Sequence, residues 1–560
     1  MIRNGFFGLF LLAILSGEVP ARDLIVEQAR WGFNGKIRNG AFGFLSVEVM
    51  NPTDEPFEGS VSLNPDGFGL GDNRSRLRQT IYLAPEVKRL LQFYPYIQDL
   101  RDWSLRWGKK GYHRLPKTKF GAPAAIRLSD AGGLGPGGFP YQHFPPTALV
   151  GELARTVSID FTPRWDPARR QAFEDWVRLG GTVRLFREGG VYPNLGPRFA
   201  EAPGIKQKRL DRGLVVFEEG GTVTGHLAGS EDPSDKAFNS GYANAADRFS
   251  RAFDRAIRPD IPWDVLGLIA IVYVLLVGPG HYFWARKLRR YSFGLAAFFG
   301  GVLLFSALFA YVGRRGYGET TTITSLAHAR LVSGKADVQS WNNAFVTKGD
   351  DYQFSHQAPF NLYSPADQFN QRSRASVRNG KDGRFEAEIP IYSAQRFVHE
   401  GLFPFDGSIT VEGLGQNRMR VVLPSSFGKV EAVWLRQDKK LYNMGREGNH
   451  YEISRVLSVV DPTAMKNDSN NFLGGYGYFG RGSTREARME QFFKQIQKAL
   501  LVQANPSWGG APARRSDAAS PAATLFVYAE TPDSFKISSE TFPQQNGRVL
   551  FEIPIYEDAP

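Results

Sequence analysis

Two long apolar stretches near the middle of the chain are the strongest feature of its hydrophobic pattern. Residues 263–285 carry one acidic residue at their start, and residues 291–312 carry no charge. Each stretch is long enough to cross a hydrocarbon core of about 30 Å as a helix. Aromatic side chains fall at both ends, as they do at membrane interfaces: Trp263 and Tyr311 at one end, and Tyr282, Trp284 and Tyr291 at the other. The pattern predicts a hairpin of two transmembrane helices, with a helical hairpin buried in a soluble core as the alternative.

The connection between the two stretches is short and basic. Residues 286–290 contain four cations, Arg286, Lys287, Arg289 and Arg290, and the positive-inside rule places such a loop in the cytoplasm. Cations also flank the outer ends of the hairpin, so the loop alone does not decide the orientation (Arg255, Arg258, Arg314 and Arg315). Just before the loop, Gly278 and Pro279 are expected to fray the first helix near the headgroups, because proline removes a backbone donor.

The N-terminal residues 1–21 have the pattern of a secretory signal peptide. Arg3 supplies a positive start, residues 6–15 are a short apolar run, and Val19-Pro20-Ala21 offers small residues for cleavage. An uncleaved N-terminal anchor is the alternative. An exported start followed by two crossings predicts a two-pass protein of the cytoplasmic (inner) membrane, with most of the chain on the periplasmic or extracytoplasmic side.

Residues 241–262, just before the first span, have the periodicity of an amphipathic helix. Apolar side chains share one face and arginines another (Phe249, Ala252, Phe253, Ala256 and Ile257 against Arg248, Arg251, Arg255 and Arg258). Such a helix either lies on the membrane surface or packs on the domain that precedes it.

Short runs of alternating apolar and polar residues dominate much of the remaining sequence. In residues 22–116 turn signals separate these runs, which predicts a small β-sandwich. Residues 313–560 show a similar pattern with one helix, at 485–502, and predict a β-rich region of one or two sandwich domains. Within it, residues 466–482 and 506–521 are rich in Asn and Gly or in Pro and Ala, and are expected to be loops.

Residues 117–240 change character and predict an α/β module. A buried strand at 156–161 is followed by Asp166 and Pro167, which suit the N-cap and first position of a helix over 167–179. Gly180-Gly181 ends this helix, and a strand follows at 182–186. Strand, helix and strand in succession predict a parallel sheet.

Composition narrows the chemistry. The 560 residues are too many for one core, and a formal net charge of +12 suits anionic partners such as lipid headgroups or acidic cell-wall polymers. No basic tract is interleaved with aromatic residues, so nucleic acid is not expected as a partner. The chain has no cysteine, which excludes disulfides, a thiol nucleophile and a cysteine zinc site.

No motif predicts a catalytic, cofactor-binding or metal-binding residue. The eight histidines are scattered, with no pair at a usual metal-ligand spacing. Residues 133–138 and 475–480 fit a Gly-x-Gly-x-x-Gly pattern, but neither has the strand and helix that a dinucleotide site needs around it. Trp103, Trp107 and Trp341 would support carbohydrate or lipid binding if they were exposed, and are otherwise expected to be core residues.

Several segments together resemble a widespread family of bacterial envelope membrane proteins. Residues 275–282 (Leu-Leu-Val-Gly-Pro-Gly-His-Tyr), followed by the basic run 286–290, are similar to the Gly-Pro, aromatic and basic loop between the two spans of that family. The helix end at 176–181 (Trp-Val-Arg-Leu-Gly-Gly) resembles a step of glutamine amidotransferase-like modules. Residues 33–35 with 47–51 are similar to the first sandwich of the family.

The resemblance implies a multi-domain α+β membrane protein. Its parts would be an N-terminal immunoglobulin-like β-sandwich, an α/β module of amidotransferase-like or flavodoxin-like type, a transmembrane helical hairpin and a C-terminal β-rich sandwich region. Amidotransferases use a cysteine nucleophile, which this chain lacks. The module would therefore be a degenerate one, reused for binding.

The expected function is that of a non-enzymatic, membrane-anchored envelope protein that presents binding or scaffold modules outside the cytoplasmic membrane. It would act as an accessory subunit of a transport or envelope-maintenance complex. The expected partners are the lipid bilayer and one or more envelope proteins, and no cofactor is expected. The alternative is a membrane-tethered polysaccharide or cell-wall hydrolase whose two carboxylates meet only in the fold.

Overall fold

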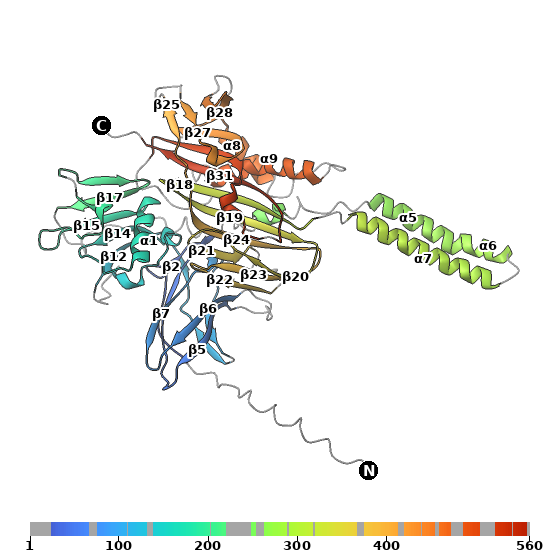
Figure 1. Cartoon of the computed structure of the whole chain (residues 1–560), viewed down its shortest axis with the longest axis horizontal. Helices are drawn as coiled ribbons and strands as arrows, with labels where there is room; N and C mark the ends of the chain where they lie inside the picture. Colours follow the sequence, from blue (N-terminus) through green and yellow to red (C-terminus); the bar gives the residue numbers. More distant parts are fainter. Residues whose placement is uncertain are drawn as a thin grey trace, which may run out of the picture.

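The computed structural model describes most of the chain as a β-rich body from which two apolar helices extend (Figure 1). The described residues are 24–66, 76–108, 110–130, 138–201, 203–219, 248–253, 263–287, 291–316, 320–366, 374–412, 419–437, 440–453, 459–471, 485–504, 521–539 and 541–556. The predicted signal peptide at 1–21, the residues Arg289 and Arg290 of the basic loop, and the stretch 475–480 lie outside them.

The first part of the chain forms short antiparallel strands that pack in two layers. One layer is β1 (Ile25–Trp31), β4 (Leu45–Met50) and β7 (Lys88–Phe93). The other includes β5 (Phe57–Pro65), β6 (Arg76–Leu83), β9 (Trp103–Trp107) and β10 (Gly111–Arg114). Their inward side chains form one core, and shorter strands pair around it at β2 (Lys36–Ile37), β3 (Ala41–Phe42), β8 (Tyr96–Ile97) and β11 (Lys119–Phe120).

The next segment forms a six-stranded sheet that is parallel except at one edge. The strands are β12 (Ala124–Ser129), β13 (Gly138–Pro140), β14 (Ala154–Ile159), β15 (Thr182–Phe186), β17 (Gly213–Glu218) and the antiparallel β16 (Gln207–Leu210).

The helix α1 (Pro167–Arg178) connects β14 to β15, and the predicted parallel pairing of these two strands is confirmed. As expected, Asp166 caps α1: its Oδ1 accepts a hydrogen bond from the Arg169 backbone N–H at 2.8 Å. Phe173 and Trp176 are buried against the sheet, which explains why this short helix holds its place.

The C-terminal part is dominated by an eleven-stranded sheet. Its strands, in spatial order, are β21 (Asn361–Pro365), β24 (Ser393–Pro404), β19 (Lys335–Val346), β18 (Thr322–Val332), β31 (Gln544–Ile555), β30 (Ala523–Glu530), β27 (Val430–Gln437), β28 (Lys440–Glu447), β29 (His450–Ile453), β26 (Arg420–Val422) and β25 (Thr410–Glu412). Strand β30 is buried along almost its whole length, so it reads as a nearly continuous apolar run rather than an alternating one.

Two helices pack near this sheet. The predicted helix is confirmed as α9 (Arg485–Ala504), and the Oη of Tyr528 on β30 donates a hydrogen bond to the Phe493 carbonyl at 2.9 Å. The expected loop at 466–482 is wrong at its start, because α8 (Pro462–Asn471) occupies residues 466–471. Asp461 accepts a hydrogen bond from the Thr463 N–H at 2.8 Å, a cap that begins this polar helix.

One sheet joins the chain before the apolar helices to the chain after them. Strands β20 (Asp350–Phe354), β22 (Ala375–Arg378) and β23 (Arg384–Ile389) continue the layer of β10, β9, β5 and β6 into a seven-stranded sheet. The junction is the parallel pair β6–β22, in which Ser376 faces Arg76 and Val377 faces Leu77.

The apolar face of the helix predicted before the first span packs on protein. Residues 248–253 are helical, and Phe249, Ala252 and Phe253 are buried. The ring of Phe249 lies 4.6 Å from that of Trp341 on β19, and the ring of Phe253 lies 5.5 Å from that of Phe492 on α9. The surface-lying alternative is therefore wrong for these residues, and their partner is the C-terminal part rather than the preceding domain.

Candidate functional site

The two apolar helices form an antiparallel hairpin whose side chains face outward. The first arm runs through α5 (Trp263–Leu275), a π-helical turn (Leu276–Gly280) and α6 (His281–Lys287), and the second is α7 (Tyr291–Gly316). Both are long and apolar enough to cross a membrane, with none of the first 21-residue span and 6% of the second buried. The alternative of a hairpin buried in a soluble core is wrong, because such helices would be covered by protein.

The residues from which the sequence analysis predicted the topology lie at or near the ends of the two arms of the hairpin. Tyr282 and Trp284 are 62% and 53% exposed near its tip, where Arg286 and Lys287 end α6. Trp263 begins α5 and Tyr291 begins α7.

Gly278 and Pro279 do not end the first arm. They lie in the π-helical turn, and helix continues beyond it, so the expected fraying is wrong. In a π turn the backbone hydrogen bonds join residues five apart rather than four. The helix can therefore continue past Pro279, which has no backbone N–H to donate. Beyond the turn, His281 Nε2 lies 2.8 Å from the Gly294 carbonyl oxygen of α7, a polar contact between the two arms.

A buried cluster of charged side chains joins the α/β module to the C-terminal sheet. Arg212, in the turn between β16 and β17, is fully buried, and its Nη1 lies 2.9 Å from Glu552 Oε1 on β31. Its other guanidinium nitrogens donate to the carbonyl oxygens of Glu552 at 2.7 Å and Leu331 at 3.1 Å. His328 Nε2 lies 3.0 Å from Glu552 Oε2, and Arg330 Nε lies 3.9 Å from Oε1.

The charges around Glu552 decide its ionisation. Burial by itself would raise the pKa of this carboxyl, but Arg212, with His328 and Arg330, outweighs burial and holds the pKa well below its usual range. Glu552 is therefore ionised at neutral pH and is shared by cations from both parts of the chain. A second ion pair joins the same two parts of the chain, with Lys335 Nζ 2.7 Å from Asp175 Oδ2 of α1.

A charged cavity of about 680 Å³ opens at the junction of β6 and β22. Arginines and carboxylates both line it: Arg76, Arg78 and Arg374, with Asp351, Glu386 and Glu388. The cavity is thus built by strands that precede the two apolar helices in the sequence and strands that follow them. Its mixed charges suit a ligand that carries an anionic group and hydrogen-bond donors.

Arginines continue across the outer face of the same sheet. Ser62 on β5 lies between Arg106 of β9 and Arg78 of β6, and Arg378 of β22 lies directly opposite Arg384 of β23. Like charges on neighbouring strands repel. Within the part of the chain that the structure describes, neither Arg78 nor Arg378 makes an ion pair, so this face offers cations to an anionic partner.

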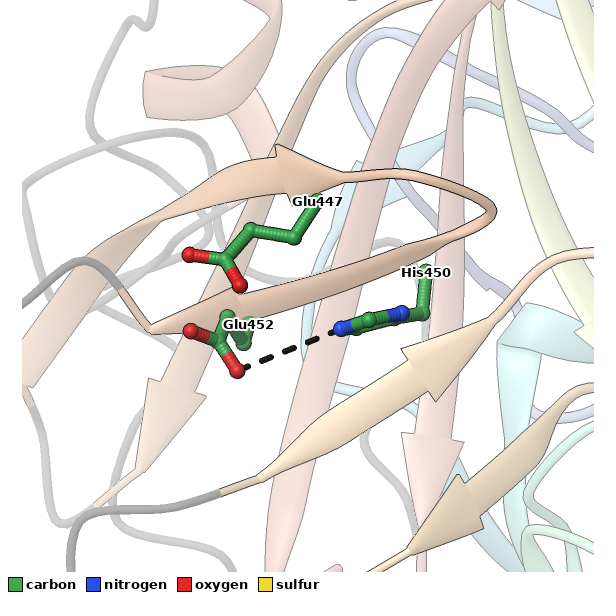
Figure 2. Close-up of side chains that lie close together, drawn as sticks. All are labelled: Glu447, His450 and Glu452. Carbon is green, nitrogen blue, oxygen red and sulfur yellow. Dashed lines mark ion pairs between the residues drawn. The ribbon is translucent and has the colours of Figure 1, made fainter.

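A third polar group lies on the hairpin of β28 and β29, away from the two apolar helices (Figure 1). Glu447 faces His450 across the turn, and Glu452 lies two residues further along β29 on the same face. The ligating atoms of these three residues all lie within 4.8 Å of one another. Figure 2 shows the His450 ring directed toward the Glu452 carboxylate, at 4.0 Å.

The scattered histidines gave no hint of this cluster in the sequence. The signal that would have found it is the order Glu-x-x-His-x-Glu across Gly448-Asn449, where a two-residue turn folds the three side chains onto one face. The tryptophans considered for ligand binding are in the core instead. Trp103, Trp107 and Trp341 are 3%, 4% and 2% exposed, so binding through exposed rings at these positions is excluded.

Comparisons with known proteins do not identify the chain. No protein-family model matches it, and no curated protein does. One similar solved structure is that of a cycloisomaltooligosaccharide glucanotransferase from Paenibacillus sp. complexed with cycloisomaltoheptaose. It is 9% identical over 78% of this chain and 98% of that chain, with a TM-score of 0.16. A TM-score this low establishes no common fold and carries no argument about function.

Proposed function

We propose that this protein is a two-pass membrane-anchored envelope protein that presents a binding body on the extracytoplasmic side of the cytoplasmic membrane. The observation that carries the proposal is the seven-stranded sheet, which pairs β6 from before the hairpin with β22 from after it. Two strands of one sheet lie on the same side of a bilayer, because no open sheet crosses the hydrocarbon core. The chain between them therefore crosses an even number of times.

Three further contacts across the hairpin support the same conclusion. Arg212 reaches Glu552, Lys335 reaches Asp175, and Phe249 packs on Trp341. Each joins residues that the membrane spans separate in sequence. A body held together in this way cannot be divided between two compartments.

The basic tip of the hairpin supports the orientation. Arg286 and Lys287 end the first arm at the tip, opposite the body, and Arg289 and Arg290 follow in the sequence. Short loops rich in Lys and Arg remain in the cytoplasm. The body then lies outside, in agreement with the signal peptide that the sequence predicts at 1–21.

The body serves as a binding module rather than as an enzyme in this proposal. The family resemblance places an immunoglobulin-like sandwich at 22–116 and a degenerate amidotransferase-like module at 117–240. The chain contains no cysteine for amidotransferase chemistry. The cavity at the β6–β22 junction and the arginines around it supply a surface for an anionic envelope partner, consistent with an accessory subunit of a transport or envelope-maintenance complex.

Crosslinking in intact cells, followed by detergent extraction and affinity capture, tests this binding role. We expect the full chain to capture a reproducible envelope partner. The double variant Arg78→Glu, Arg378→Glu should capture at least about tenfold less of that partner, because the charge of two exposed arginines is reversed. The matched control is Arg187→Glu, an exposed arginine of the α/β module, which should capture as the parent does. Recovery of the chain alone, or equal capture by the double variant, would contradict the proposal.

The hydrolase alternative has one specific observation in its favour. Asp351 and Glu388 are cross-strand partners that line the cavity, and both are exposed. Cross-strand neighbours have Cβ atoms about 5 Å apart, close to the separation of carboxylates in a retaining glycosidase. Turnover of a cell-wall polysaccharide that disappears in both Asp351→Asn and Glu388→Gln, but not in Asp350→Asn, would establish the hydrolase and replace the proposal above.

A further inference from the structure

The geometry of the β28–β29 hairpin points to a metal site that no comparison assigns: we propose that Glu447, His450 and Glu452 bind a first-row divalent ion of the zinc class. The three side chains come from one rigid element. Gly448 has a φ of 62°, a conformation that favours glycine, and it opens the two-residue turn that sets Glu447 opposite His450. The ligands are therefore positioned by the strand pairing rather than by a loose loop.

The histidine is the first sign of a ligand site. His450 Nε2 is shielded from solvent and makes no hydrogen bond to any residue in the described parts of the chain. A buried ring nitrogen without a hydrogen bond costs free energy. Its nearest charged neighbour is Glu452 Oε2 at 4.0 Å, too far for a hydrogen bond and close to the spacing of two ligands around one ion.

The carboxylates are the second sign. Glu447 and Glu452 bring two negative charges within 4.8 Å of each other and of the imidazole. Arg420 is the cross-strand neighbour of Glu452, but its guanidinium lies 3.7 Å from Glu412 instead. Within the described residues no lysine or arginine makes an ion pair with Glu447 or Glu452, so a bound cation would relieve the repulsion between them.

The sheet leaves room for an ion beside these ligands. Glu452 faces Gly445 on β28, and a Cβ added at Gly445 would meet nothing within 4 Å. This open space can hold water molecules that complete the coordination. Ligands on a tetrahedral ion with bonds of about 2.0–2.1 Å lie about 3.3 Å apart, so rotation of the two flexible glutamates closes the site.

The donor set selects the class of ion. One imidazole nitrogen and two carboxylate oxygens suit Zn²⁺ and its first-row neighbours, with water in the fourth position. Ca²⁺ takes six to eight oxygen ligands, and Mg²⁺ keeps most of its own waters, so neither benefits from the imidazole. We therefore expect Zn²⁺ to bind well ahead of Ca²⁺ and Mg²⁺.

Titration of the chelator-treated, detergent-solubilised full chain with Zn²⁺, followed by calorimetry, tests the site. We expect one ion per chain at this site, with affinity lowered at least about tenfold in each of His450→Ala, Glu447→Gln and Glu452→Gln. His113→Ala is the matched control, because His113 lies on β10 away from the cluster, and it should bind as the parent does. Ca²⁺ and Mg²⁺ should give no comparable heat.

Two further measurements keep the result unambiguous. Zn²⁺ should raise the melting temperature of the parent but not that of His450→Ala, whose metal-free melting temperature should match the parent. Co²⁺ bound at the site should give visible absorption bands that are lost in His450→Ala. Zinc binding that is unchanged in His450→Ala, or no binding above that of the three variants, would overturn the proposal.

Discussion

Arg212→Ala is expected to cost about 3–5 kcal/mol of folding free energy, because it leaves Glu552 buried and short of its main counter-charge. The guanidinium of Arg212 is fully buried and makes contacts to the carboxylate and carbonyl of Glu552 and to the carbonyl of Leu331. His328 and Arg330 remain near Glu552 but do not replace these bonds. We expect this loss of stability to lower the urea concentration at which half of the detergent-solubilised chain is unfolded.

The matched control for this variant is Arg187→Ala. Arg187 pairs with Glu201 at 3.2 Å, and both side chains are exposed, so its removal should change stability by less than about 1 kcal/mol. If Arg212→Ala and Arg187→Ala shift the midpoint equally, the buried cluster does not hold the module to the C-terminal sheet.

Stability is expected to fall steeply as the pH drops below about 6.5, because two buried histidines resist protonation. His356 and His399 stack with ring centroids 3.7 Å apart. Burial lowers the pKa of His356 to about 3, and burial together with His356 lowers the pKa of His399 well below its usual value. The unfolded chain takes up protons near pH 6.5 and the folded chain does not, so each histidine costs about 1.4 kcal/mol per pH unit below that value.

The double variant His356→Gln, His399→Gln isolates this effect. Between pH 6.5 and 5 its unfolding free energy should change with pH less steeply than that of the parent, by an amount that rises from about one proton at pH 6.5 to nearly two protons, or about 2.7 kcal/mol per pH unit, at pH 5. This window lies above the range in which Glu552 protonates, since the usual Glu pKa is about 4.3 and a depressed folded pKa costs stability only as the pH falls below that value. The control His113→Gln, at a half-buried position on β10, should keep most of the parent slope. An unchanged slope in the double variant would show that the pair is not kept neutral by burial.

Local sequence signals predicted the helices well where the chemistry at their ends was explicit. Asp166 and Pro167 marked the start of α1, and Gly180-Gly181 marked its end to within a residue or two. The two apolar helices were evident from length and apolar character alone. Because such signals involve only a few neighbouring residues, they can be recognised in the sequence alone.

Contacts between segments far apart in the sequence could not be predicted from such local signals. The pairing of β6 with β22 joins residues about 300 positions apart, and no local pattern names the partner of a strand. No local pattern marks Arg212, in a turn, as a buried residue, because the carboxylate that it contacts, Glu552, lies at the far end of the chain. The ligand cluster at Glu447, His450 and Glu452 needed both the turn and the strand register to become visible.

The measurement that tests the two-pass account most directly is cysteine labelling in sealed, right-side-out membrane vesicles. The chain has no cysteine, so single variants at exposed positions report cleanly: Thr80→Cys before the hairpin, Lys381→Cys after it and Lys287→Cys at its tip. A membrane-impermeant maleimide should label Thr80→Cys and Lys381→Cys in intact vesicles, and Lys287→Cys only after detergent is added. Labelling of Thr80→Cys without Lys381→Cys, or the reverse, would place the two flanks on opposite sides of the membrane and contradict the account.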